Sequence, residues 1–441
     1  MQDSTTSGAG KTSRRDFVKT TAAAAAATAA VMSIPKGVYA IGNGAIKVGL
    51  VGCGGRGSGA ALNALHAGKD IQLVALGDMF QDHLESSLKN LSADPDYGNQ
   101  VDVPTKRQFV GWDAYKGVIQ EADMVILATP PHFRPMHLKA VADANKHCFC
   151  EKPVAVDAPG VKKQMETSRQ FMANGKSLVS GLCYRYDEHK INLMNRVHDG
   201  DIGKIVALQC NYLTTGLWSK PRQPDWSDME WQLRNWLYFT WLSGDMITEQ
   251  HIHSLDKMMW TMKDVPPATA YSSGGRTVRT ERPQFGNVYD HFATVYEWED
   301  GTKLFAHARQ WTNPTGKFDT DIYKDVSDYI FGTEGTAAVQ AHVITGKKPW
   351  KGPSKVHSSV MYDAEHVALA NAIRQNKPIN NGDYMCKSTM MAIMGRMAAY
   401  TGRVVTWDEA LNSKEDFTPA KYAFGPVELP EVAIPGNKDL V

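Results

Sequence analysis

Six consecutive residues near the start of the chain have the composition of a phosphate-binding turn. They are four glycines with a cysteine and an arginine among them: Gly52, Cys53, Gly54, Gly55, Arg56 and Gly57. An apolar run, 47–51, precedes them, and small residues with helical character, 58–67, follow. Glycines at a strand-to-helix turn let the backbone approach a pyrophosphate, whose charge faces the N–H groups of the helix N-terminus. The spacing predicts a dinucleotide site, with a purely structural turn as the alternative.

An acidic residue follows at the position where such a site needs one. Asp78 ends the next apolar run, about twenty residues beyond the glycines. There a carboxylate accepts hydrogen bonds from the adenine ribose hydroxyls and repels a 2′-phosphate. We therefore predict NAD as the cofactor. NADP is the alternative, because Arg56 in the turn would soften the repulsion.

A second set of polar residues could move protons. Glu249, His253 and Asp256 are spaced at i, i+4 and i+7, and the apolar residues around them recur at helical spacing, so the three share one helix face. An acid beside an imidazole suits general acid–base chemistry, although a hydrogen-bonded structural face is the alternative. His251 lies about 200° around the helix from His253, which argues against a shared metal ion. We predict no metal.

Tryptophan is concentrated in one stretch of the chain. Five of the eleven tryptophans fall between residues 218 and 241, and they are Trp218, Trp226, Trp231, Trp236 and Trp241. Arg222, Arg234, Asn235 and Tyr238 lie among them. Aromatic faces beside planar polar groups suit sugars, which present apolar C–H faces and hydroxyl rims. Core or subunit-interface packing is the alternative.

The elements that position these residues change in character along the chain. Up to about residue 180, strand-like runs alternate with helix-like stretches, which predicts an α/β Rossmann domain with a doubly wound parallel sheet. Beyond it long strand-like runs dominate, which predicts an α+β domain with a large, mostly antiparallel open sheet. The predicted strands are 46–51, 71–76, 124–128, 148–150, 205–212, 288–298, 302–310 and 329–331, and the predicted helices include 136–145, 364–374 and 385–400. Methionines in the last of these should fill the core.

Composition excludes several classes of protein. Residues 1–40 hold five of the 48 Lys and Arg and two of the 47 Asp and Glu, so the remainder carries a net charge near −2. A net charge this close to zero does not indicate a nucleic-acid-binding protein. No run reaches the roughly 18 apolar residues of a membrane span. The six cysteines form no zinc-type pairs, and we expect buried thiols, with a disulfide as the minor alternative.

The N-terminus has the order of an export signal. Residues 13–19, with the sequence SRRDFVK, precede an Ala-rich stretch, 20–31, and then Val38, Tyr39 and Ala40. This resembles a twin-arginine signal, with a basic Ala-rich tail as the alternative. We predict residues 1–40 as the signal, 41–178 as the Rossmann domain, and 179–441 as the substrate-binding and oligomerisation domain. The export machinery is then a partner, and the location is the periplasm.

The order of motifs resembles the glucose-fructose oxidoreductase, inositol dehydrogenase and MocA (Gfo/Idh/MocA) family over essentially the whole mature chain. After the glycine turn and Asp78 come Thr129-Pro130 with His132, and then Glu151-Lys152-Pro153. The resemblance continues through 181–187, 200–204 and 332–336. It implies an NAD(P)-dependent oxidoreductase acting on a sugar, glycoside or polyol, with Thr129, Pro130, His132, Glu151 and Lys152 at the cofactor.

The resemblance also assigns roles in the chemical site. Lys152 enters beside the nicotinamide and is the first candidate for proton transfer. In the family an Asp stands four residues before a His in the substrate pocket, which maps to Glu249 and His253 here. Glutamate in place of aspartate, and His251 where glycine is usual, are departures that leave the substrate and the division of acid and base roles open. Further predicted substrate-binding residues are Tyr184, Arg185, Arg234, Trp236 and His251, with Tyr289, His291 and Arg309 as weaker candidates.

Two other functions compete with the dehydrogenase. One is a glycoside hydrolase that oxidises its substrate transiently with NAD, as α-N-acetylgalactosaminidases of this fold do, and the other is a catalytically silent sugar or nucleotide sensor. The intact lysine and histidine count against the sensor. Because free NAD is scarce outside the cytoplasm, we expect the cofactor to stay bound. An open sheet needs its outer face covered, so we expect a homodimer or homotetramer.

Overall fold

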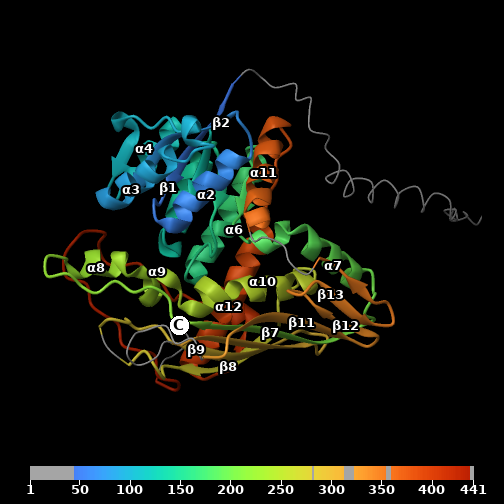
Figure 1. The fold of residues 1–441 in the computed structure, drawn as a ribbon. Helices are drawn as coiled ribbons and strands as arrows, with labels where there is room; N and C mark the ends of the chain where they lie inside the picture. The colour runs from blue at the N-terminus through green and yellow to red at the C-terminus, as the bar shows by residue number, and fades with distance from the viewer. Residues whose placement is uncertain (1–43, 281–282, 312–321, 354–358, 438–441) are drawn as a thin grey trace, which may run out of the picture. The chain divides into compact units, whose positions relative to one another are not determined.

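The computed structural model describes residues 44–280, 283–311, 322–353 and 359–437 (Figure 1). The predicted signal, 1–40, lies outside these ranges, and export stays a prediction. Residues Ala45–Val441 form one compact unit. No helix among the described residues is long and apolar enough to cross a membrane.

The first part of the chain builds a Rossmann sheet, as predicted. Its strands are β1 (Ile46–Val51), β2 (Ile71–Asp78), β3 (Gln108–Val110), β4 (Met124–Leu127), β5 (His147–Cys150) and β6 (Leu178–Ser180). Six strands in the described residues pair in parallel in the order β3-β2-β1-β4-β5-β6. The order reverses direction beside β1, and ligands of open α/β sheets bind at the carboxyl ends of the strands there. The glycine turn follows β1, and Thr129 follows β4.

Helices cover both faces of this sheet. They are α2 (Gly55–His66), α3 (Gln81–Ser92), α4 (Ala114–Glu121), α5 (Arg134–Asp143) and α6 (Ala158–Ala173), with short 3₁₀ turns η1 (Gly98–Gln100), η2 (Thr105–Arg107) and η3 (Pro131–Phe133). The strands other than the edge strand β3 are almost entirely buried, which explains their continuous apolar runs. Because β6 ends at Ser180, the sheet runs two residues past the domain boundary predicted at 178.

The second part builds a sheet of nine strands within the described residues, mostly antiparallel as predicted. They are β7 (Ile205–Thr215), β8 (Thr269–Gly275), β9 (His291–Glu297), β10 (Lys303–Trp311), β11 (Asp325–Gly332), β12 (Gly335–Ala338), β13 (Val343–Gly346), β14 (Trp350–Lys351) and β15 (Val405–Thr406). Their order is β14-β13-β12-β11-β7-β10-β9-β8-β15, and only the β7–β10 pair among them is parallel. Leu304, Ala306 and Ala308 of β10 face the core, whereas Phe305 and His307 face away.

This part contains more helix than its strand-like texture indicated. Its elements are η4 (Cys183–Tyr186), α7 (Glu188–His198), α8 (Asp228–Arg234), η5 (Trp236–Tyr238), α9 (Thr240–Ser243), η6 (Ile247–His251), α10 (Ile252–Thr261), α11 (Ser359–Arg374), α12 (Gly382–Thr401) and α13 (Trp407–Asn412). The short helices of the tryptophan-rich stretch, which is rich in aromatic residues and lacks helical periodicity, were not predicted from the sequence.

The main core lies between the second sheet and the helices that separate it from the Rossmann sheet. Figure 1 shows α10 and α12 in this middle layer, and α12 packs against both α6 and β8. Methionines of α12 are fully buried there, as predicted. A helix buried on every side has no polar face, which explains its weak sequence pattern. All six cysteines are free and buried, so the buried-thiol prediction is confirmed.

Candidate active site

The glycine turn has the geometry of a phosphate cradle. Gly52 has φ +97°, a conformation that side chains disfavour. A Cβ on Gly57 would stand 1.8 Å from the carbonyl oxygen of Gly52, so helix α2 approaches the turn too closely for any other residue. Gly54 and Gly55 instead face open space at their Cβ positions. The turn can therefore admit a pyrophosphate against its backbone, and the residues fit a dinucleotide.

Asp78 both holds this turn and faces the adjoining cavity. Its Oδ2 accepts a hydrogen bond from the backbone N–H of Cys53 at 2.6 Å, and its Oδ1 accepts one from the N–H of Phe80 at 2.9 Å. His83 Nδ1 lies 3.4 Å from Oδ1. Because each carboxylate oxygen has more than one acceptor direction, ribose hydroxyls can bind while these bonds persist.

A cavity of about 280 Å³ opens beside Asp78. It is lined by Val51, Gly52, Gly54, Asp78, Met79, Phe80, His83, Gly111, Trp112, Asp113, Ala114, Tyr115, Ala128, Thr129, Pro130, Phe133, Met136, His137, Leu233, Trp236 and Tyr422. The glycine turn and Asp78 place it at the adenosine end of a dinucleotide, and we call it the adenosine cavity. Thr129 and Pro130 line it as the resemblance implied. His132 does not, because its Nε2 bonds the hydroxyl of Tyr422 at 2.8 Å.

Lys152 lies at the chemical end of the site. It follows β5, and its Nζ contacts Glu249 Oε1 at 2.9 Å and also donates to the Glu249 backbone carbonyl. Both side chains are largely buried, with 13% and 11% of their surfaces exposed. Glu249 lies on η6, a single π-helical turn. Such turns interrupt the regular backbone hydrogen-bond ladder and are frequent at functional sites.

His253 lies next to this pair on the first turn of α10. The ring of Tyr184 meets it edge to face at 5.5 Å, and its Nδ1 has no hydrogen-bond partner among the described residues. Burial, reinforced by the positive charges of Lys152 and Lys257, holds the pKa of His253 well below its ordinary value. The imidazole is therefore neutral near pH 7. The structure thus brings together Lys152, Glu249, His253 and Tyr184.

Arg56 of the glycine turn reaches toward the same region. Its Nε forms an ion pair with Glu151 Oε1 at 2.7 Å, and its guanidinium lies 4.8 Å from the ring centre of Tyr362 on α11. It is not among the residues that line the adenosine cavity. The ion pair engages Nε of Arg56, and the choice between NAD and NADP stays a prediction.

Several predicted substrate residues lie elsewhere because other charges hold them. The Arg185 guanidinium binds Asp256 and Asp264 at 2.9 and 2.6 Å, so its donors serve an internal ion-pair network. Asp256 shares the predicted helix face but belongs to this network. His251 is fully buried, with Nε2 3.4 Å from the sulfur of Cys210. The donors of Arg185 are thus engaged by carboxylates, whereas Nδ1 of His251 has no hydrogen-bond partner among the described residues.

The tryptophan-rich stretch serves the adenosine end instead of the chemical end. Trp236 lines the adenosine cavity, and Trp231 and Trp241 belong to a buried aromatic cluster with Phe80 and Phe133. Arg234 forms an ion pair with Asp82 of α3. That Arg234 and Trp236 contact the sugar stays a prediction.

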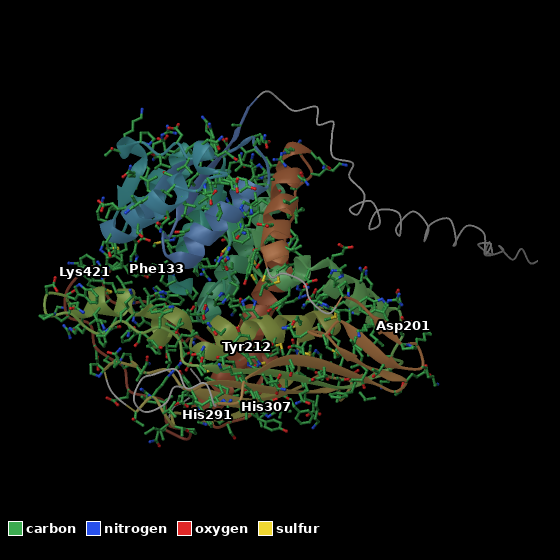
Figure 2. All side chains as sticks on the ribbon, in the orientation of Figure 1. Phe133, Asp201, Tyr212, His291, His307 and Lys421 are labelled. Carbon is green, nitrogen blue, oxygen red and sulfur yellow. The ribbon has the colours of Figure 1, made fainter. Side chains whose placement is uncertain are left out.

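The weaker candidates also lie away from the lysine. Tyr289 donates to the carbonyl of Ala433, Arg309 donates to that of Tyr323, and His291 pairs with Asp290. Figure 2 shows His291 and His307 on the face of the second sheet that points away from the Rossmann sheet.

Sequence reasoning missed several residues around the site. Trp112 and Tyr115 follow β3, Leu233 lies in the last turn of α8, and Tyr422 comes from the chain's last segment, and all line the adenosine cavity. None stands in a motif. Only the aromatic character of Trp112 and Tyr422 was available as a signal, and nothing in the sequence indicates that segments so far apart meet.

Comparison with known proteins identifies the family. The profile described as "Oxidoreductase family, NAD-binding Rossmann fold" matches residues 46–172, and that described as "GFO/IDH/MocA C-terminal domain" matches residues 192–338. Together they cover more than half of the chain. The chain belongs to the Gfo/Idh/MocA oxidoreductase family. The motif order that resembled this family in the sequence is thereby confirmed.

Individual Gfo/Idh/MocA relatives are distant. The chain is 23% identical to inositol 2-dehydrogenase of Salmonella typhimurium over 221 residues. The matched region covers 50% of this chain and 55% of that protein. It is 25% identical to 2,7-anhydro-N-acetylneuraminate hydratase of Escherichia coli over 179 residues, and this matched region covers 41% of this chain and 43% of that protein. The chain thus spans about half the length of the curated relatives it matches.

Solved structures share the fold over a larger span. Scyllo-inositol dehydrogenase from Lactobacillus casei, with bound NAD(H) and scyllo-inositol, matches with a TM-score of 0.62 and 17% identity, covering 82% of this chain and 99% of that chain. Aldose-aldose oxidoreductase from Caulobacter crescentus matches with a TM-score of 0.61 and 17% identity at the same coverage. At these identities the likeness establishes the fold.

Proposed function

We propose that this Gfo/Idh/MocA protein is an NAD-dependent dehydrogenase that transfers hydride between the nicotinamide and a hydroxyl-bearing carbon of a sugar, glycoside or polyol. The observation that carries the proposal is the meeting of Lys152, Glu249 and His253 at the carboxyl end of β5, beside a turn that fits a pyrophosphate. The names of the relatives support the substrate class.

When bound, NAD supplies the acceptor for the hydride that leaves the carbinol carbon. The hydroxyl proton must then leave the oxygen, and the chain has to take it. His253 is neutral near pH 7, because its pKa is lowered, and with Nδ1 unpartnered among the described residues it is the group we assign to take that proton. Lys152, oriented by Glu249, donates a hydrogen bond to the substrate oxygen. This division gives His253 the role of base, whereas the resemblance alone put Lys152 first.

The cofactor proposal is NAD, retained during turnover. Asp78 supports the choice of NAD over NADP, because its carboxylate lines the adenosine cavity and Arg56 is engaged by Glu151. The same buried carboxylate disfavours a 2′-phosphate.

We also propose export through the twin-arginine pathway to the periplasm, on the order of segments in residues 1–40. A homodimer or homotetramer is supported by apolar side chains on the second sheet, since Val206, Tyr271 and Phe305 are about half exposed. Covering them would remove apolar surface from water.

The competing functions gain less support. Neither curated relative named above is a glycoside hydrolase, and the dehydrogenase is preferred. A silent sensor would have no use for a buried lysine held by a carboxylate next to a neutral histidine.

The test is single-turnover reduction of bound NAD by a panel of sugars and polyols, using Lys152→Ala and His253→Ala. The rate of each variant should fall by a factor of about 10² to 10⁴, as it does when a proton-transfer group is removed. Nucleotide binding and folding should change little. Lys347→Ala is the matched control, because Lys347 forms an exposed pair with Glu334 at 3.0 Å and should keep the full rate. Wild-type rates in both site variants would overturn the proposal.

A further inference from the structure

The adenosine cavity is walled by parts of the chain that lie far from the Rossmann sheet in sequence. One wall comes from the glycine turn, Asp78 and the residues after β3 and β4. Another comes from Leu233 and Trp236 of the tryptophan-rich stretch, with Tyr422 of the last segment. The matched C-terminal domain profile ends at residue 338, so Tyr422 lies outside it.

The last segment is packed against the Rossmann sheet by aromatic rings. The ring of Tyr422 lies 5.7 Å from that of Trp112 and 5.8 Å from that of Phe133, and its hydroxyl bonds His132. Phe424 lies parallel to Phe80 at 6.3 Å. Figure 2 shows Lys421, on this segment, and Phe133, at the edge of the Rossmann part, on the same side of the molecule.

Both ends of the segment are fastened. Upstream, Glu415 pairs with the buried Arg396 at 2.7 Å, and the N–H of Phe417 donates to Asp157. Downstream, the N–H of Met229 on α8 donates to the carbonyl of Gly425 at 3.1 Å. The segment is therefore held against α8 by backbone contact. We call residues 415–429 the strap.

Helix α8 is in turn fastened to the helix that follows Asp78. Arg234 pairs with Asp82 on α3 at 3.0 Å, and its guanidinium lies 3.8 Å from the ring centre of Phe80. The ring of Phe80 therefore contacts both Arg234 and Phe424 of the strap. The strap, α8 and α3 form one continuous wall next to the ribose-binding carboxylate.

We propose that the strap forms part of the binding site for the adenosine half of NAD, and that its Tyr422 retains the dinucleotide between catalytic cycles. The inference rests on the proposed function, because it takes NAD as the occupant. An adenine ring is planar and aromatic, and Trp112, Trp236 and Tyr422 offer it aromatic surface in a largely apolar cavity. Leaving the cavity requires the nucleotide to break contacts with the strap as well as with the Rossmann sheet, which slows dissociation.

The experiment measures the dissociation rate of NADH from the full-length protein by displacement with excess NAD, followed through nucleotide fluorescence. Tyr422→Ala should raise the rate about tenfold or more, since it removes one aromatic wall of the cavity. Tyr422→Phe keeps the ring and loses the bond to His132, so it should change the rate by less than about threefold. Lys414→Ala is the matched control, because Lys414 is exposed just before the strap begins, and it should leave the rate unchanged.

A second measurement needs no substitution. Trypsin cuts after lysine, and bound NADH should slow cutting at Lys421 in the wild-type protein by holding the strap closed. Cutting that NADH leaves unchanged would overturn the proposal even if Tyr422→Ala does not fold. An unaltered dissociation rate in a folded Tyr422→Ala variant would overturn it too. If the wild-type protein does not bind NADH at all, both the proposed function and the proposed role of the strap fail. If it binds NADH but the strap tests fail, only the role of the strap is refuted.

Discussion

Replacing Asp78 gives a sharp test of how the cofactor is chosen. The carboxylate holds the glycine turn through the N–H of Cys53 at 2.6 Å and faces the adenosine cavity as well. Asp78→Ala would remove both functions at once and strand the N–H of Cys53. Asp78→Asn is the more conservative change, because its amide oxygen can still accept from Cys53 while the negative charge is gone, and only the bond from the N–H of Phe80 is lost to the NH2 group.

The expected magnitude follows from the contacts. A hydrogen bond to a charged group contributes about 1.5 to 3 kcal/mol, so losing the charged ribose contact should weaken NAD binding by about 10- to 100-fold in Asp78→Asn. NADP should bind the variant better than it binds the wild type, because the 2′-phosphate no longer meets a carboxylate. Asp78→Ala should weaken both nucleotides further, since a stranded buried N–H costs about 1 to 3 kcal/mol.

The assay is titration of apo protein with NAD and with NADP, by calorimetry or by quenching of tryptophan fluorescence. The quantity of interest is the ratio of the two dissociation constants. An exposed carboxylate on the same Rossmann domain provides the control, and Asp102→Asn, with 63% of its side chain exposed and no place in the cavity wall, should leave the ratio unchanged. An Asp78→Asn ratio equal to that of the wild type would refute the assignment of Asp78 to the ribose.

Two further predictions concern export and stability. Replacing Arg14 and Arg15 by lysine should keep the protein in the cytoplasm, and the mature wild-type protein should begin near Ile41; fractionation and N-terminal sequencing check both, and unchanged export would contradict the signal. Burial, reinforced by Glu151, raises the pKa of Glu365, so the folded protein holds a proton that the unfolded chain loses above about pH 4.3. Stability from this group is therefore full below that pH and declines as pH rises, by up to about 1.4 kcal/mol per pH unit. Glu365→Gln should flatten the decline between pH 5 and 8 in urea unfolding, and an identical pH profile would refute the burial argument.

Local patterns were sufficient for the Rossmann part because its chemistry is local. The glycine turn, Asp78 and the apolar strands can be recognised from residues close together in the sequence, because backbone conformation and the pattern of buried residues depend on near neighbours. The helical face at 249–256 likewise placed Glu249 and His253 together, although the π-helical turn at Ile247–His251 is not visible in the spacing. Lys152 needed the resemblance, because a Glu-Lys-Pro sequence has no chemical meaning without its place in the fold.

Ion pairs between residues far apart in the sequence determine where the arginine side chains lie, and the sequence pattern could not predict these pairs. Arg185 looked available for a substrate until the fold placed Asp256 and Asp264 against it. Arg56, predicted in the phosphate-binding turn, pairs through Nε with Glu151, which lies 95 residues farther along the chain. A guanidinium pairs with whichever carboxylate the fold brings near, and sequence separation says nothing about that distance.

By itself, the sequence determined the fold class, the glycine turn, the acidic residue at the end of β2 and the acid–imidazole helix face, because each depends on residues within one or two elements. Only the tertiary structure decided that the tryptophan-rich stretch and Tyr422 wall the adenosine cavity, and that Lys152 is held by Glu249. Those contacts join segments that are separate in the chain. They exist because burying aromatic surface and pairing buried charges stabilise one arrangement of the whole molecule, which no local pattern records.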